Sequence, residues 1–456
     1  TEQLGFIKKE EQFDYTTIAQ STKHTFYKQS ITLPDNTRND LTCETQKIQA
    51  FLPNKILPLE LIQKLPSLLK NDNRELTLII DNATIVDATI HPKAPNILGI
   101  AIDIGTTTID VVIVDLEKKE VLYNHSIYNK QRQYGQDVIS RIVFTEKKNA
   151  TKLLQRSVLE SIEELLHDFE NKTGLQTAFI YKASIAANTT MTHLLYGIEP
   201  SSIRTYPYSP IINKFPVFKA KDISLPINFN ANVYTLPNVS SFIGGDIVAG
   251  VISTGIHQSE ELCLLVDLGT NGEIILGNRD WLMSCSCSAG PAFEGASISC
   301  GSRPITGAIN SISIDNNKQV LFSTIENASP VGVCGSALID LVANMFNKKI
   351  INKQGRFTEN QKEFPIYQDK KTKISIDEND INNILRTKGA IFAGITLLLE
   401  SLGLTYSDLD KVYIAGILGK NINIDNAINL GLLTDIDKSK YNFIGNSSLI
   451  EAKVLL

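Results

Sequence analysis

One pattern occurs twice in the sequence, as LGIAIDIGTTTIDVVIVDL at residues 98–116 and as LCLLVDLGTNGEIILGN at residues 262–278. Each copy is an apolar run that ends in Asp, then a turn of Gly and Thr, then a second apolar run. This order is typical of a tight β-hairpin. The repeat predicts two similar lobes, the second beginning near the glycine-rich GGDIVAG at Gly244.

Both copies carry residues suited to binding a polyphosphate. A buried carboxylate is costly unless it meets a cation, and a Gly-Thr turn offers N–H groups and hydroxyls to phosphate oxygens. We therefore predict that Asp103 and Asp267 are catalytic and hold a hydrated magnesium ion between them, while water attacks the phosphate. Ordinary structural turns are the alternative. The predicted phosphate-binding residues are Gly105, Thr106, Thr107, Thr108, Gly269, Thr270, Asn271 and Glu273.

A third element, KVYIAGILGK at residues 411–420, is a short apolar strand that breaks into small residues. Small residues at a strand end let a base or ribose lie against the backbone. Ala415, Gly416 and Gly419 are therefore predicted to form an adenosine wall. Taken alone, the element is also a common way for a strand to pass into a loop.

Composition excludes several classes of function. The 456 residues carry a net charge of −5, which argues against a nucleic-acid partner, and no apolar run is long enough for a membrane helix. The first residues lack the apolar core of a secretory signal, which predicts a cytoplasmic location. Cys285, Cys287, Cys300 and Cys334 match no standard metal spacing and are predicted to be buried, and His193 is predicted to be packed.

Periodicity divides the chain into four parts. Residues 1–55 are polar and predicted to be irregular, and residues 56–97 form a small α/β module of one helix and two strands. Residues 98–243 form the first lobe and residues 244–456 the second. Long helices are expected at residues 152–172 and 381–402, where Gly389 and Gly394 permit close packing of a helix or a ligand.

In order, DIGTTT, DLGTNGE and AGILGK resemble the two phosphate motifs and the adenosine motif of the acetate kinase, sugar kinase, heat-shock chaperone and actin superfamily. The resemblance implies a two-lobed α/β ATPase made of duplicated ribonuclease H-like domains, with ATP and Mg²⁺ as cofactors. A closer resemblance, to the reductive activators of corrinoid proteins, covers nearly all of residues 98–456. It is carried by YGQDVISRI, AANTTMTHLLYGI, PNVSSFIGGDIVAG, CSCSAGPAFEGASISCG, VCGSALIDLV and KVYIAGILGKNINIDNAINLGLL.

This closer resemblance implies reactivation of a corrinoid methyl carrier that has drifted from cob(I)alamin to cob(II)alamin. ATP binding between the lobes, docking of the corrinoid protein and one-electron reduction of cobalt are its expected parts. The implied partners are the corrinoid protein and a low-potential electron donor, and a homodimer is compatible with it. A small-molecule kinase of the same superfamily, or a non-redox ATP-dependent clamp on a protein, are the alternatives.

The sequence departs from the family in its cysteines, because relatives carry a ferredoxin-like domain with four cluster ligands. Only Cys43 precedes the first lobe, in a context that resembles the end of such a domain. One Cys cannot hold a two-iron two-sulfur cluster, so electron delivery by this chain is in question. Ile417 also replaces an expected Gly, and Pro304 with Thr306 replaces an Ala-rich stretch.

Residues 288–307, SAGPAFEGASISCGSRPITG, are the candidate partner-facing loop. Small residues there are combined with oxygen-bearing side chains that could alter the coordination of cobalt. We expect Glu294 and Ser297 to face the partner, with Ser299 and Arg303 in the same loop. The alternative is a loop that only supports the second phosphate hairpin.

Overall fold

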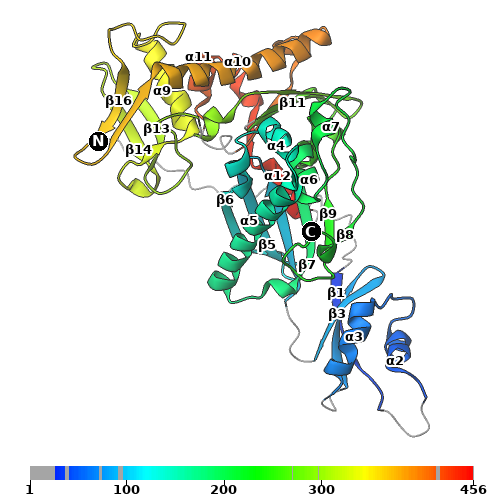
Figure 1. The fold of residues 1–456 in the computed structure, drawn as a ribbon. Coiled ribbons are helices and arrows are strands. Elements are labelled where there is room, and N and C mark those ends of the chain that lie inside the picture. Colours follow the sequence, from blue (N-terminus) through cyan, green and yellow to red (C-terminus); the bar gives the residue numbers. More distant parts are fainter. Residues whose placement is uncertain are drawn as a thin grey trace.

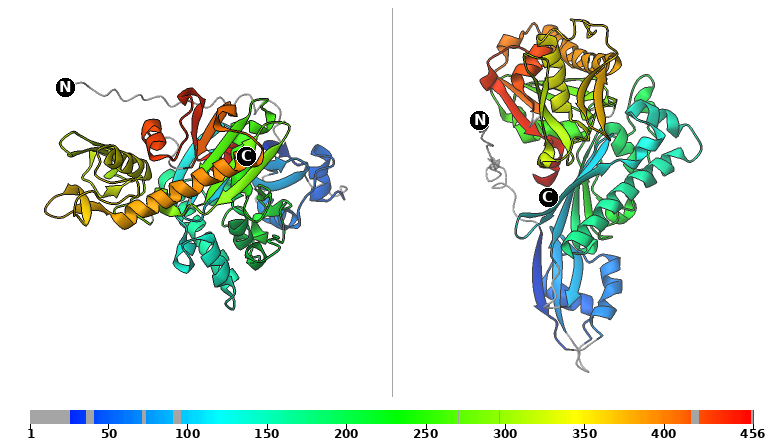
Figure 2. Two further views of the ribbon diagram at one scale, coloured as in Figure 1. Left: turned by 90° about the horizontal axis from the view of Figure 1, so that it is seen from above. Right: turned by 90° about the vertical axis from the view of Figure 1, so that its left-hand side faces the viewer.

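The computed structural model describes residues 26–35, 41–70, 74–90, 96–269, 271–295, 297–416, 422–454 and 456. Three parts follow one another along an elongated molecule: a small N-terminal module, a middle lobe and a far lobe (Figures 1 and 2). We call the middle part lobe I and the far part lobe II, each defined by its central sheet. No helix among these described residues is long and apolar enough to cross a membrane.

The N-terminal module is a three-stranded antiparallel sheet, in the order β1-β2-β3, with two helices. The predicted helix and both predicted strands of this module are present. The expectation that residues 1–55 are irregular is wrong for two elements, β1 and α2, because Ile31 and Ile48 are buried in the same core as Leu76. Residues 1–25 lie outside the described part. The elements are β1 (Phe26–Thr32), α2 (Glu44–Phe51), α3 (Leu59–Leu68), β2 (Glu75–Asp81) and β3 (Thr84–Ile90).

Lobe I is built on a six-stranded sheet in the order β6-β5-β4-β7-β9-β8. The first predicted hairpin is β4–β5, which pairs antiparallel, and β7 and β9 continue the sheet in parallel. Helix α5 (Ala150–Thr173) confirms the predicted helix and buries its apolar face against this sheet. The strands are β4 (Leu98–Ile104), β5 (Thr108–Asp115), β6 (Glu120–Tyr128), β7 (Ile180–Ala187), β8 (Phe218–Lys219) and β9 (Asn232–Thr235).

Lobe II repeats this arrangement in a five-stranded sheet, β12-β11-β10-β18-β19. Three antiparallel strands are again followed by two parallel ones, with the second predicted hairpin at β10–β11. The predicted third element begins as β18. Matching strand order in the two sheets confirms the expected duplication. The strands are β10 (Cys263–Leu268), β11 (Gly272–Gly277), β12 (Leu282–Cys287), β18 (Lys411–Ala415) and β19 (Tyr441–Gly445).

Two helices cross between the lobes. Helix α8 (Gly245–Thr254) follows the last parallel strand of lobe I, yet its Ile247 packs with Leu265 and Ile275 of lobe II. Helix α12 (Ser447–Val454) follows the last strand of lobe II, yet its Leu449 packs on the sheet of lobe I. The two helices also contact each other. Each lobe therefore receives a helix from the other, and both helices start at the same place between the sheets.

Lobe II also carries further strands and two long helices, α9 (Gly335–Asn347) and α10 (Glu378–Ser401), of which α10 confirms the second predicted long helix. A Cβ atom at Gly394 would lie 2.7 Å from Cδ1 of Ile274. Gly394 thus serves close packing of α10 on the sheet, whereas a Cβ at Gly389 would meet open space. The remaining elements are β13 (Ala308–Ile314), β14 (Val320–Thr324), β15 (Gly332–Val333), β16 (Glu363–Gln368), β17 (Lys373–Asp377) and α11 (Ile424–Leu430).

Candidate functional site

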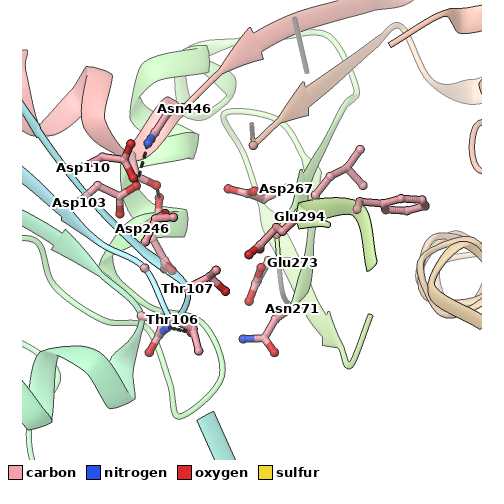
Figure 3. A pocket seen from close by; sticks show the side chains of 18 residues that line it. Asp103, Thr106, Thr107, Asp110, Asp246, Asp267, Asn271, Glu273, Glu294 and Asn446 are labelled. Atoms are coloured by element: carbon pink, nitrogen blue, oxygen red, sulfur yellow. Dashed lines mark hydrogen bonds between the residues drawn. The ribbon is translucent and has the colours of Figure 1, made fainter. Parts of the chain in front are cut away.

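The two hairpin turns face each other across a cleft between the lobes (Figure 3). Its empty space is about 780 Å³, part of it open to solvent. Most of the predicted residues in the two hairpins, together with Gly416, line it. The lining residues are Asp103, Gly105, Thr106, Thr107, Thr108, Asp110, Asn188, Asp246, Asp267, Leu268, Gly269, Asn271, Glu273, Phe293, Glu294, Gly416, Asn446 and Ser448.

Polar side chains of lobe I hold the first turn from behind. The amide of Asn129 donates to the carbonyl of Gly105 at 3.0 Å, and the fully buried guanidinium of Arg141 donates to the carbonyl of Thr106. Asn188 donates to the hydroxyl of Thr106 at 3.2 Å. With its carbonyls bound in this way, the turn is held in one conformation before any ligand arrives.

Carboxylates face each other directly across both hairpins. Asp103 pairs with Asp110 in the register of β4 and β5, and Asp267 pairs with Glu273 in the register of β10 and β11. Like charges directly opposite each other in a sheet are destabilising. In both hairpins a bound cation, or protonation of one carboxylate of the pair, would relieve this repulsion.

Burial and mutual repulsion raise the pKa of these acids. Loss of solvent followed by repulsion from Asp246 raises the pKa of Asp267 to about 7, and burial raises that of Asp246 itself to about 6. The pKa values of Asp103 and Glu273 are raised well above the ordinary range, mainly by burial. Such a cluster gains stability when a bound cation supplies the missing positive charge.

The acids fit a hydrated magnesium ion better than a metal bound only by protein. No three Cys, His or acidic side chains among the described residues converge closely enough to form a metal site by themselves. Asp103 and Asp267 instead approach from opposite lobes (Figure 3). Mg²⁺ commonly keeps several waters and is bound through one or two carboxylates plus substrate phosphates.

The cleft also contains residues that were not among the predicted ones, including Asp110, Asp246 and Asn446. Asp246 lies in the first turn of α8, and Asn446 precedes α12, where its Oδ1 accepts from the N–H of Leu449 at 2.9 Å. The Nδ2 of Asn446 donates to Oδ2 of Asp103, also at 2.9 Å. The position of Asp246 in GGDIVAG and the seven-residue spacing from Asp103 to Asp110 were the available signals.

The third predicted element reaches the cleft at Gly416, whose φ is +91°. A Cβ atom there would lie 2.9 Å from the carbonyl of Leu268 and 3.1 Å from Oδ1 of Asp267. Gly416 thus allows the end of β18 to lie against the second hairpin, and Ala415 is buried beside it. The predicted Gly419 and Thr270 lie outside the described residues, as does Ile417. The adenosine wall stays a prediction.

The structure separates the residues of the candidate partner-facing loop. Glu294 lines the cleft, whereas Ser297 is exposed. The N–H of Ser299 donates to Asp380 at 2.8 Å, so this part of the loop is bound to α10. Arg303 reaches lobe I, where it donates to the hydroxyl of Ser126 at 3.1 Å. The loop as a whole is thus shared between the cleft, lobe II and the contact with lobe I.

The cysteines occupy separate places in the fold, and most of them are at least partly buried. Cys300 and Cys334 are buried, Cys285 and Cys287 are partly buried, and these four form no metal group in the described part of the chain. Cys43 is exposed at the start of α2, where the hydroxyl of Thr45 is the main cause that lowers its pKa.

His193 confirms its predicted packing. Its ring is fully buried, and Nδ1 lies 2.7 Å from the carbonyl of Thr189. The opposite ring nitrogen, Nε2, accepts from the N–H of Ile211 at 3.2 Å. Both ring nitrogens are therefore used within lobe I.

Two family models match the part of the chain that forms the two lobes. Residues 98–259 match the family model described as the RACo middle region, and residues 261–456 match the C-terminal domain of RACo, the ASKHA domain. The boundary between these matches falls after α8, later in the chain than Gly244.

Named relatives agree with the family models. The chain is 32% identical over 405 residues to the corrinoid activation enzyme RamQ of Eubacterium limosum, covering 84% of this chain and 68% of the relative. It is 26% identical over 400 residues to the Co(II) methylated amine-specific corrinoid protein reductase of Methanosarcina barkeri, covering 78% and 69%.

A solved structure extends the match to three dimensions. The reductive activator for corrinoid, iron-sulfur protein superposes with a TM-score of 0.86 at 39% identity, over 94% of this chain and 72% of that one. The predicted family and the predicted actin-like α/β fold are both confirmed. This chain belongs to the family of reductive activators of corrinoid proteins.

Proposed function

We propose that this chain binds ATP between its lobes and uses it to drive reduction of a corrinoid protein from cob(II)alamin to cob(I)alamin. The observation that carries the proposal is the cleft, in which two matching Asp-Gly hairpins from different lobes face each other. The names of its relatives supply the substrate class. The electron comes from a low-potential donor, and ATP and water yield ADP and phosphate.

Each part of the cleft has a role in this proposal. The N–H groups and hydroxyls from Gly105 to Thr108 bind phosphate oxygens, and Gly269 with Asn271 does so from the other lobe. Asp103 and Asp267 hold magnesium through water and orient the attacking water. When bound, Mg²⁺ neutralises phosphate charge. Gly416 lies where the nucleoside would approach the backbone.

ATP is needed because the cobalt couple lies at very low potential, where each 59 mV uphill costs about a tenfold factor in the one-electron equilibrium. A protein that changes the spacing of its lobes with the state of the nucleotide can supply this free energy. It does so by binding the corrinoid partner differently in the two states. The cytoplasmic location, the homodimer and the identity of the electron donor stay predictions.

The test follows cob(I) absorbance in a mixture of this chain, a cob(II)-loaded corrinoid protein from the same source and a low-potential chemical reductant. We expect ATP with Mg²⁺ to speed the appearance of cob(I), and ADP to have no such effect. ATP hydrolysis without any effect on cobalt would contradict the proposal and favour a kinase. ATP-dependent binding of the partner without reduction would favour a clamp. The chemical reductant bypasses the question of electron entry near Cys43.

A further inference from the structure

Arg303 is a basic side chain of lobe II that contacts lobe I. Its guanidinium lies 4.2 Å from the ring centroid of Tyr128, at the end of β6, and donates to the hydroxyl of Ser126 at 3.1 Å. A guanidinium stacked on an aromatic ring and hydrogen-bonded at its edge is held in orientation as well as in position. The contact therefore depends on how the two lobes are placed.

This contact continues into the cleft through Ser126. The hydroxyl of Ser126 also hydrogen-bonds Asp110. Asp110 in turn faces Asp103 across the hairpin. A chain of contacts thus runs from lobe II through Ser126 to the acids beside the phosphate turn.

A second cavity lies beside the cleft and brings Arg303 close to the first turn. It is lined by Arg303 together with Thr107, Thr108 and Glu294, and the last three also line the cleft. Among the described residues that line either cavity, Arg303 is the only basic one. A polyphosphate in the cleft would therefore meet few positive charges other than its own metal ion and Arg303.

We propose that Arg303 is a positioning residue that couples closure of the two lobes to nucleotide turnover. It acts through Tyr128, Ser126 and Asp110: its contacts form when the lobes approach, and they set the position of the acids beside the first phosphate turn. The inference rests on the proposed nucleotide function of the cleft. It gives Arg303 a role within this chain, and the partner-facing role of Glu294 and Ser297 stays a prediction.

Arg132 provides a matched control. Its guanidinium also lies 4.2 Å from the centroid of Tyr128, but Arg132 belongs to lobe I. Replacing it removes the same kind of contact on the same ring without affecting the connection between lobes. Arg303→Lys is a second control, because it keeps the charge and loses the planar group that stacks and donates at once.

The experiment measures ATP hydrolysis under saturating ATP, and the change in radius of gyration on adding Mg-ATP by small-angle X-ray scattering. Arg303→Ala is expected to lower kcat at least tenfold, about 1.4 kcal/mol, with KM changed less than threefold, and to abolish the compaction. Arg303→Lys should show most of this loss, and Arg132→Ala should stay within about twofold of wild type.

A variant of the ring tests the same contact without changing a charge. Tyr128→Leu should reproduce the loss seen in Arg303→Ala, and the double variant should be no worse than either single one. Additive losses, or equal effects of Arg132→Ala and Arg303→Ala, would overturn the inference. Compaction by Mg-ATP that depends on Arg303 while cobalt is unaffected would instead uphold this inference and refute the proposed function.

Discussion

The turns of the two hairpins carry similar residues but are supported differently. In lobe I, side chains of Asn129 and Arg141 bind the turn carbonyls, and Asn446 donates to Asp103. In lobe II, the side-chain hydrogen bond found at the described turn residues runs from Sγ of Cys287 to the carbonyl of Gly272. Asp267 instead is buried among other acids, and its burial followed by their repulsion raises its pKa to about 7.

This difference suggests that the two turns have different roles in ligand binding. In the proposed function the first turn binds phosphate, and its hydrogen-bonded carbonyls fix its shape before a ligand arrives. The second turn brings an uncompensated negative charge, which becomes favourable only when a cation enters the cleft. Binding of Mg-nucleotide would therefore pull lobe II onto a fixed lobe I, and each prediction below tests one side of this contrast.

The largest effect is expected from Asp267→Asn. Loss of the carboxylate removes the charge that lobe II offers to magnesium, so ATP hydrolysis should fall by about 100-fold or more. The nucleotide-free variant should nevertheless be more stable than wild type, because a repelled buried charge is gone. Steady-state hydrolysis and thermal unfolding on the same sample check both parts. A variant that is less stable and equally active would contradict the assigned role.

Glycine replacements compare the rigidity of the two turns directly. A Cβ atom at Gly105 would lie 2.9 Å from the backbone carbonyl of Thr108, whereas at Gly269 the nearest atom would be 3.4 Å away. Gly105→Ala should therefore cost about 1–3 kcal/mol in unfolding free energy and weaken ATP binding at least tenfold. Gly269→Ala should change stability by less than about 0.5 kcal/mol. Urea unfolding and nucleotide titration measure both, and equal effects would remove the contrast.

The acids of the cleft predict a pH dependence of stability. The folded pKa values of Asp246 and Asp267, about 6 and 7, exceed the unfolded value near 4, so the folded state holds protons that the unfolded state releases. Their contribution is full below about pH 4 and is lost as pH rises through 7. Because each pKa unit corresponds to about 1.4 kcal/mol, the nucleotide-free protein should lose on the order of 5 kcal/mol from this source.

Burial lowers the pKa of His193, which acts in the opposite direction, so the comparison is made between variants. Unfolding free energies of wild type and Asp267→Asn, measured from pH 5 to pH 8, should diverge as pH rises. Saturating Mg-ADP should reduce the divergence, because the metal compensates Asp267. Parallel curves would show that the pKa of Asp267 is not raised.

The smallest effect concerns Asn446, which caps α12 and donates to Asp103. Asn423 caps α11 in the same way, with its Oδ1 accepting from the N–H of Asn426 at 3.1 Å, but it is not among the described residues that line the cleft. Replacement of either by Ala should cost about 1 kcal/mol of stability. Asn446→Ala alone should also change nucleotide affinity, by a few fold. Equal affinities in the two variants would mean that Asn446 serves only as a cap.

Local patterns made much of the fold predictable. Both hairpins, β18, α5 and α10 follow from apolar periodicity and turn residues that lie close together in the sequence. Strand β1 and helix α2 were not predicted, because they contain few apolar residues and show no clear periodicity. Ile31 and Ile48 are buried only through the core that they share with strands distant in the sequence.

The site residues that belong to the repeated motif were predictable from the sequence. The site residues that come together only in the folded chain were not. Asp103 and Asp267 stand at equivalent points of a visible repeat. Asp246 and Asn446 come from crossing helices whose starts meet only in three dimensions, and Asp110 emerges from strand register. In the loop at residues 288–307, sequence alone did not show that Glu294 lines the cleft while Arg303 contacts lobe I.

The most direct test of the central claim compares wild type and Asp267→Asn in one cobalt assay. Each is mixed with cob(II)-loaded corrinoid protein, Mg-ATP and a low-potential reductant, and the rate of cob(I) appearance is recorded. The account predicts ATP-dependent formation of cob(I) with wild type, and a rate with Asp267→Asn no higher than without ATP. Equal rates for the two proteins, or a wild-type rate that ignores ATP, would contradict it.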